Sequence, residues 1–127
     1  MKIAKILAFE QVYPKLKNLP LNVKASFILS KIHQLALLDI EIYRNSFSDI
    51  INKYGQKDEE GKIKISENGN FIPIEEDKML ECQKEIEELE NIEVSNYDNY
   101  KISIDDLANI ELTPEDLDNL TAFLKEE

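Results

Sequence analysis

The chain has 127 residues, 43% of them hydrophobic, and its formal net charge is −11. This length fits a single domain, residues 1–127, and the single cysteine excludes an intramolecular disulfide. The excess of negative charge argues against direct binding to nucleic acid, because it would repel the phosphates. No apolar run approaches the ~20 residues of a membrane-spanning helix, so the sequence predicts a cytoplasmic protein without a membrane partner.

The charge is divided unequally along the chain. Residues 1–57 carry nine basic and four acidic side chains, whereas residues 58–127 carry six basic and 22 acidic ones. Two explanations stay open. Either the two halves pack together and neutralise one another, within one chain or between two, or the acidic half offers its surface to a basic partner.

Two helices are predicted in the basic half. Apolar residues recur at helical spacing over residues 3–18, and Pro14, which lacks an amide donor, predicts a break near Tyr13. Residues 22–54 contain neither Gly nor Pro and predict one long helix, with Asn22 as its N-cap. The predicted apolar stripe of this helix consists of Ile28, Ile32, Leu35, Leu38, Ile42, Phe47, Ile50, Ile51 and Tyr54.

The long helix exceeds the width of a compact domain of this size, since about 32 residues at 1.5 Å each give about 48 Å. Other helices must therefore pack along it, or its exposed stripe must contact another chain. The sequence leaves both arrangements open, including a homodimer through residues 22–54.

Residues 62–74 have the pattern of a β-hairpin. Their first residues alternate between polar and apolar, and Asn68-Gly69 is the strongest short signal for a two-residue type I′ turn. In that register Ile63 lies opposite Ile74 on one face. The sequence therefore predicts an α+β fold that is mainly α, with a long central helix, two or three helices packed on it, and a small antiparallel sheet.

An acidic amphipathic helix is predicted over residues 75–91, with three acidic residues at its N-terminus, where negative charge is favourable. Its apolar stripe includes Cys82, which indicates a small core residue. The segments 92–94 and 100–102 are interpreted as short strands or as extended links.

The C-terminal segment repeats one helix-start pattern after ten residues. Ser103 and Thr113 are predicted N-caps, each followed three residues later by an aspartate, in a variant of the capping box. Pro114 at the first helical position favours a helix start. The pattern predicts a short helical turn and then a C-terminal helix over residues 113–124.

No catalytic or metal-binding constellation is present in the sequence. His33 is the only histidine and Cys82 the only cysteine, which excludes the usual zinc spacings. The three glycines lie in separate turns, and the loop at residues 58–61 matches only a fragment of an EF-hand. The sequence thus predicts a protein that is not an enzyme, with no catalytic residue, no metal and no cofactor.

The candidate partner-binding residues are acidic side chains of residues 75–93 and 105–118. Such faces imitate the charge of a nucleic-acid backbone toward a basic protein, or they only keep a small protein soluble. The predicted partner is a protein, and a basic nucleic-acid-binding host protein is one candidate. The candidate residues are Glu75, Glu76, Asp77, Glu81, Glu85, Glu87, Glu88, Asp105, Asp106, Glu115 and Asp116.

Several short segments in a fixed order carry a family resemblance. They are Arg44, Tyr54-Gly55-x-Lys57-Asp58-Glu59-x-Gly61, Asn68-Gly69, residues 85–89, residues 102–107 and Leu112-Thr113-Pro114-x-Asp116-Leu117. Together they resemble a family of small phage and prophage proteins from low-GC Gram-positive bacteria, described as a domain of unknown function, over residues 22–124. The resemblance supplies no catalytic residue. It implies a phage context, in which small acidic proteins inhibit host defence systems, assist assembly or form part of the virion.

The leading functional hypothesis is a non-enzymatic, phage-encoded protein that binds another protein stoichiometrically and inhibits a host defence system, in the style of anti-CRISPR proteins. The first alternative is a structural or assembly protein of the virion, from the tail or lysis module, which the long helix motivates. The second alternative is a small-ligand-binding protein.

Overall fold

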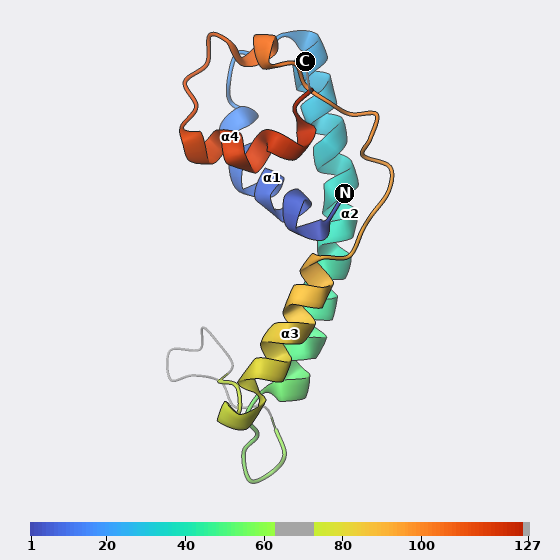
Figure 1. Cartoon of the computed structure of the whole chain (residues 1–127), viewed down its shortest axis with the longest axis vertical. Helices are drawn as coiled ribbons and strands as arrows, with labels where there is room; N and C mark the ends of the chain where they lie inside the picture. Colours follow the sequence, from blue (N-terminus) through green and yellow to red (C-terminus); the bar gives the residue numbers. More distant parts are fainter. Residues whose placement is uncertain (63–72, 126–127) are drawn as a thin grey trace. The chain divides into compact units, whose positions relative to one another are not determined.

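The computed structural model describes residues 1–62 and 73–125 (Figure 1). Along them the chain forms the α-helices α1 (Ile3–Leu16), α2 (Val23–Tyr54), α3 (Met79–Glu90) and α4 (Pro114–Leu120). Three short 3₁₀ helices accompany them, η1 (Glu76–Lys78), η2 (Ile104–Leu107) and η3 (Thr121–Phe123).

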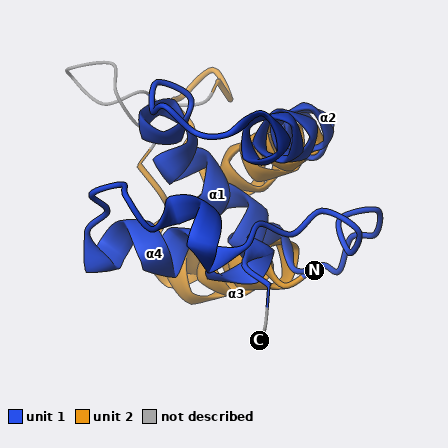
Figure 2. Cartoon of the chain, turned by 90° about the horizontal axis from the view of Figure 1, so that it is seen from above, with its two compact units in different colours: residues 1–41, 92–127 blue, residues 42–91 orange. Residues whose placement is uncertain are grey.

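The chain divides into two compact units (Figure 2). Unit 1 comprises residues 1–41 and the chain from residue 92 onwards, and unit 2 comprises residues 42–91. The helix α2 contributes its first part to unit 1 and its last part to unit 2.

The predicted α+β class is wrong for the described residues, which form helices and isolated bridges but no strand. The turn at Asn68-Gly69 lies outside the described residues. The segments 92–94 and 100–102 are extended links, each with one bridge, and not strands. The bridges join Lys2 to Glu93, Gly55 to Ile74, and Ile102 to Leu124.

The predicted register pairs Ile74 with Ile63, which lies outside the described residues. Within the described residues, Ile74 forms an antiparallel bridge with Gly55, directly after α2. The amide of Gln56 donates to the carbonyl of Pro73 at 2.8 Å in the same pairing. A pattern with period two indicates an extended segment but does not specify which segment pairs with it.

Unit 1 has its core on one face of α1. The five buried residues of this helix follow steps of three and four, so they form one stripe. The ring of Phe9 packs edge-on against Phe123 with the centroids 5.1 Å apart, and the ring of Tyr97 also packs edge-on against Phe123, at 5.9 Å. The stripe consists of Ile3, Ile6, Phe9, Val12 and Leu16.

The break predicted near Tyr13 is wrong, since α1 runs through Pro14 to Leu16. A proline removes its own amide hydrogen bond, but Pro14 lies within one turn of the helix end. The next turn closes normally, because the amide of Lys17 donates to the carbonyl of Tyr13 at 3.0 Å. Burial of the α1 stripe outweighs the single lost bond.

The predicted long helix is confirmed, and so is its N-cap, because the amide of Ala25 donates to Asn22 Oδ1 at 2.8 Å. Its predicted stripe is partly wrong. Ile32 is buried as predicted, but Leu38 is 64% exposed and Ile42 is also exposed. In unit 1 the buried face of α2 consists of Ala25, Leu29, Ile32, Ala36 and Ile40.

In unit 2, α3 packs antiparallel along the last part of α2, as predicted for the helix at residues 75–91 (Figure 1). The hydroxyl of Tyr43 donates to Glu90 Oε1 at 3.3 Å, and Lys53 Nζ donates to Glu85 Oε1 at 3.0 Å. Cys82 is buried, which confirms the small core residue. Burial raises the pKa of its thiol, as does the nearby charge of Glu85.

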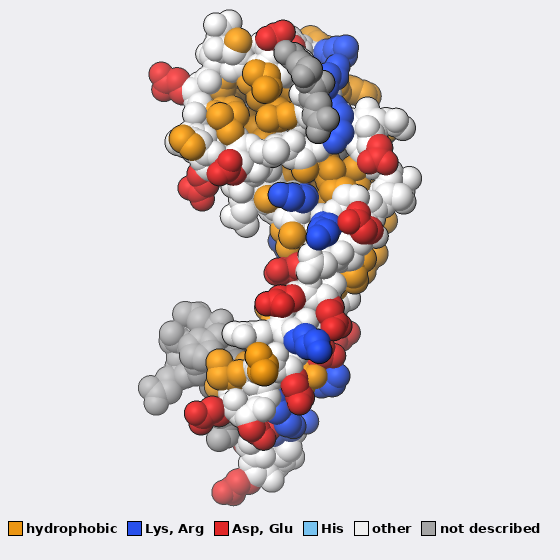
Figure 3. Space-filling view, viewed as in Figure 1, with side chains coloured by type: hydrophobic (Ala, Val, Ile, Leu, Met, Phe, Trp, Pro, Cys, Tyr) orange, Lys and Arg blue, Asp and Glu red, His pale blue; other side chains and the backbone are white. Residues whose placement is uncertain are grey.

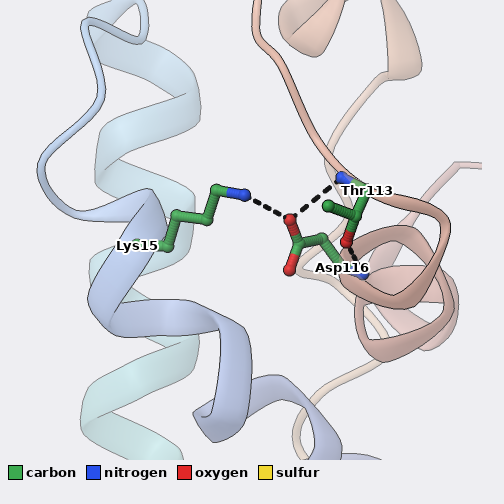
Figure 4. A network of polar contacts seen from close by, with 3 residues as sticks. All are labelled: Lys15, Thr113 and Asp116. Atoms are coloured by element: carbon green, nitrogen blue, oxygen red, sulfur yellow. Dashed lines mark hydrogen bonds and ion pairs between the residues drawn. The ribbon is translucent and has the colours of Figure 1, made fainter.

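The helix start at Thr113 is a complete capping box (Figure 4). Thr113 Oγ1 accepts from the amide of Asp116 at 3.1 Å, and the amide of Thr113 donates to Asp116 Oδ2 at 3.0 Å. Lys15 Nζ donates to the same carboxylate oxygen at 2.5 Å, so one aspartate caps α4 and joins it to α1. The predicted C-terminal helix at 113–124 is confirmed as α4 followed by η3.

Replacing Thr113 with alanine is expected to lower the free energy of unfolding by about 1 kcal/mol, because the amide of Asp116 loses its cap. Urea denaturation followed by circular dichroism measures this. The variant Thr113→Ser keeps the hydroxyl oxygen and serves as the matched control. If alanine and serine give equal stabilities, the hydroxyl does not stabilise α4.

Candidate protein-binding surface

Seven of the candidate acidic residues belong to unit 2 and precede or occupy α3. Glu75 pairs with Lys78 at 3.4 Å. Glu85 accepts from Lys53, and hydrogen bonding by Tyr54 and Lys53 lowers the pKa of its carboxyl. These two side chains are therefore engaged within unit 2. The other five, exposed to solvent, are Glu76, Asp77, Glu81, Glu87 and Glu88.

Four candidate residues belong to unit 1, and two of them have structural partners. Asp106 accepts a hydrogen bond from Asn22 Nδ2 at 2.8 Å, which fixes η2 to the start of α2. The hydrogen bond from Lys15 holds the pKa of Asp116 below its usual 3.8. Asp105 and Glu115 are exposed. The structure thus divides the candidate residues between two units, and their role in binding stays a prediction.

An apolar groove in unit 1 was missed from the sequence. It lies at η2 and α4 and has a volume of about 230 Å³. Figure 3 shows hydrophobic side chains gathered on this face, with acidic side chains around them. The described residues that line it are all aliphatic: Ile104, Leu107, Ala108, Ile110, Leu112 and Leu117.

The repeated helix-start pattern was the available signal for this groove. Both repeats place an apolar residue before the N-cap and another five residues further on, and three of these four residues line the groove. Three of the lining residues remain open to solvent: Ile104 at 54%, Leu117 at 40%, and Ala108. The packing of the two helix starts thus buries only some of the groove residues and leaves the others exposed.

The sequence around the groove is strongly acidic. Residues 102–120 contain six acidic side chains and neither lysine nor arginine. Two of the six are Asp106 and Asp116, whose partners are Asn22 and Lys15. The remaining four are exposed: Asp105, Glu111, Glu115 and Asp118.

A second group of exposed apolar residues lies on α2, on the side of the helix away from its buried stripe. In unit 1, Val23 is 87% exposed and Phe27 is 65% exposed. Leu37 and Leu38 are also exposed further along the helix. Exposing apolar side chains of this size to water is unfavourable, so these residues of α2 are a further candidate for contact with another molecule.

A larger hollow of about 840 Å³ adjoins the groove, since Ile104 lines both. Lys101 and Lys125 contribute to it, and Lys101 Nζ donates to the carbonyl of Ala122 at 2.6 Å. The hollow borders Lys125, the last described residue.

His33 has structural partners within unit 1. Its Nδ1 lies 2.8 Å from Glu10 Oε1, and its ring stacks on Tyr13 with the centroids 4.0 Å apart. Across residues 1–62 and 73–125, no three or more His, Cys, Asp or Glu side chains are grouped to hold a metal ion. Nor does any helix in these ranges have the length and apolar character to cross a membrane.

No family model, curated protein or solved structure matches this chain. The resemblance to small phage proteins therefore stays a prediction that rests on the matching segments of the sequence.

Proposed function

We propose that this protein is a non-enzymatic binding module that acts by forming a stoichiometric complex with another protein. The observation that carries this proposal is the apolar groove at η2 and α4, together with its exposed rim of Asp105, Glu111, Glu115 and Asp118. A patch of exposed apolar residues with a polar border is typical of protein-interaction sites.

The excess of acidic side chains supports a basic partner. In unit 2 the exposed Glu81, Glu87 and Glu88 add to the negative field. Such a field accelerates association with a positively charged protein and disfavours acidic competitors. A basic nucleic-acid-binding protein has the matching charge.

The phage resemblance supplies the biological setting of the proposal. In that setting the partner is a component of a host defence system in the bacterial cytoplasm, and the acidic surface occupies the site that normally binds nucleic acid. Inhibition then needs only binding and no catalytic residue.

A role in virion assembly is the second candidate, and the exposed face of α2 favours it. Val23 and Phe27 are available for contact with a neighbouring subunit. Mass spectrometry of purified virions separates the two candidates, because an inhibitor of host defence is absent from the particle and an assembly component is present in fixed copy number.

Affinity capture from host lysate at about 0.05 M and about 0.5 M salt tests the proposal, since screening weakens contacts between exposed charges. We expect one protein to be retained in stoichiometric amount, and less of it at high salt. The double variant Glu87→Lys with Glu88→Lys should reduce retention. Glu85 is left unchanged because it contacts Lys53 within unit 2.

The matched control is the double variant Glu59→Lys with Glu60→Lys, which makes the same charge change in an exposed loop of unit 2. It should retain the partner as the wild type does. Equal losses in both double variants would show that net charge alone matters and not the α3 surface. No stoichiometric partner at either salt concentration would contradict the proposed function.

A further inference from the structure

The groove at η2 and α4 differs in size from a site for a small molecule. Its volume of about 230 Å³ falls below the ~300–1,000 Å³ of most ligand pockets. Among the described residues, its lining offers no polar side chain with which to orient a metabolite. It suits instead a few apolar side chains that enter from a larger partner.

The charge around the groove restricts the partner further. Every charged residue of the segment 102–120 is acidic, and four of them, interspersed in sequence with the lining residues, are exposed. An occupant with acidic flanks would meet repulsion from Asp105, Glu111, Glu115 and Asp118, which outnumber Lys101 and Lys125 of the adjoining hollow. An occupant that combines apolar side chains with lysine or arginine would satisfy both the lining and the rim.

We propose that this groove binds a basic amphipathic helix of the partner protein. The helix places apolar side chains, three or four residues apart, on the exposed lining residues Ile104, Ala108 and Leu117. Its lysine or arginine side chains then lie beside Asp105, Glu111, Glu115 and Asp118. This inference rests on the proposed function and names the partner surface, in the helix-in-groove mode that uses such spacing.

The attachment of η2 to its surroundings favours a groove that is formed before binding. Ser103 caps η2 by accepting from the amide of Asp105 at 3.3 Å, and Asp106 is fixed by Asn22. On the other side, α4 is held by its capping box and by Lys15. A groove whose walls are fixed in advance loses less conformational entropy when a helix enters.

The probe for this proposal is a synthetic amphipathic helix of about 14 residues, or four turns, made of leucine and lysine. A matched peptide carries glutamate in place of lysine. Both are labelled, and binding is followed by fluorescence anisotropy at about 0.15 M salt, where the Debye length is about 8 Å. We expect saturable one-to-one binding of the lysine peptide and none of the glutamate peptide.

The variant Leu117→Lys places a cation in the groove and should weaken binding of the lysine peptide at least about tenfold. Leu80→Lys is the matched control, because it makes the same change on α3, where Leu80 is 79% exposed. It should change the affinity less than about twofold. Ile104→Lys is the second groove variant, and circular dichroism verifies that each variant is folded.

Three results would overturn the proposal. Equal affinities of the groove variants and Leu80→Lys would place the peptide elsewhere, and equal binding of the glutamate peptide would exclude charge recognition. If the protein self-associates and Leu117→Lys abolishes the self-association, the occupant of the groove is a second copy of this chain. In each case a partner captured from lysate by the wild type would still support the proposed function.

Discussion

Replacing Phe9 with alanine is expected to lower the free energy of unfolding by about 3–5 kcal/mol, the usual range for a fully buried phenylalanine. Phe9 has no exposed surface and lies in the buried stripe of α1. Its ring meets Phe123 at 5.1 Å and Tyr13 at 5.7 Å, so truncation leaves a cavity between α1 and the C-terminal segment. The total free energy of unfolding of a small domain is only about 5–15 kcal/mol, so this loss is a large fraction of the stability.

The matched control is Phe27→Ala, which removes the same side chain from a position that is 65% exposed. It should change the free energy of unfolding by less than about 0.5 kcal/mol. Urea denaturation of both variants measures the contrast. Equal losses would contradict the assignment of Phe9 to the core and of Phe27 to the surface.

The second large effect is expected for Tyr97→Phe, which removes one oxygen atom from a fully buried side chain. Tyr97 donates a hydrogen bond to Asp39 Oδ2 at 2.5 Å, and this bond connects the loop to α2 within unit 1. Loss of a bond to a charged acceptor is expected to lower the free energy of unfolding by about 1.5–3 kcal/mol. The matched variant Tyr100→Phe lies in the same stretch and is partly exposed; it should have little effect.

The same residue gives the stability a defined dependence on alkaline pH. Burial, and then the hydrogen bond to Asp39 and its charge, raise the pKa of Tyr97 well above its usual 10.0. Between pH 10 and the folded pKa, the Tyr97 hydroxyl therefore keeps its proton in the folded state and loses it in the unfolded state. The stability that this group contributes is complete below pH 10 and falls by about 1.4 kcal/mol for each further pH unit, until the folded pKa is reached.

The difference between wild type and Tyr97→Phe isolates this effect, since all other groups titrate in both proteins. The deficit of the variant should be larger at about pH 8 than at about pH 11, because only the wild type loses this contribution. Urea denaturation at the two pH values provides the comparison. A deficit that is constant with pH would show that the hydroxyl is not protected in the folded state.

Features that depend on neighbouring residues were predictable from the sequence. The caps at Asn22 and Thr113 follow from side chains that bond amides two or three positions away, and both formed as predicted. The bounds of α2 followed from the absence of Gly and Pro. In each case the interaction is specified within a few residues, and distant packing does not compete with it.

Features that depend on distant residues were not predictable in the same way. The sequence favoured Leu38 and Ile42 for the buried stripe of α2, because large apolar residues mark a core most clearly. The observed stripe instead includes the small residues Ala25 and Ala36, both of which are fully buried. Which face of a helix becomes buried is settled by its packing partner.

The candidate surface shows the same limit. The abundance of acidic residues made them candidates, but the sequence did not distinguish the acidic residues that have partners inside the fold. Glu85 contacts Lys53 and Asp116 contacts Lys15, whereas Glu87 and Glu115 remain free to meet solvent. The groove residues were noted only as parts of helix starts, because their meeting requires the chain to bend between η2 and α4.

The measurement that tests the account most directly is a titration of the ¹⁵N-labelled protein with the leucine–lysine peptide, followed by amide chemical shifts. Binding in the groove predicts that the shifted amides cluster in residues 103–118 and saturate at one peptide per chain. Shifts confined to α3, or shifts spread over every acidic segment in proportion to its charge, would contradict binding in the groove between η2 and α4.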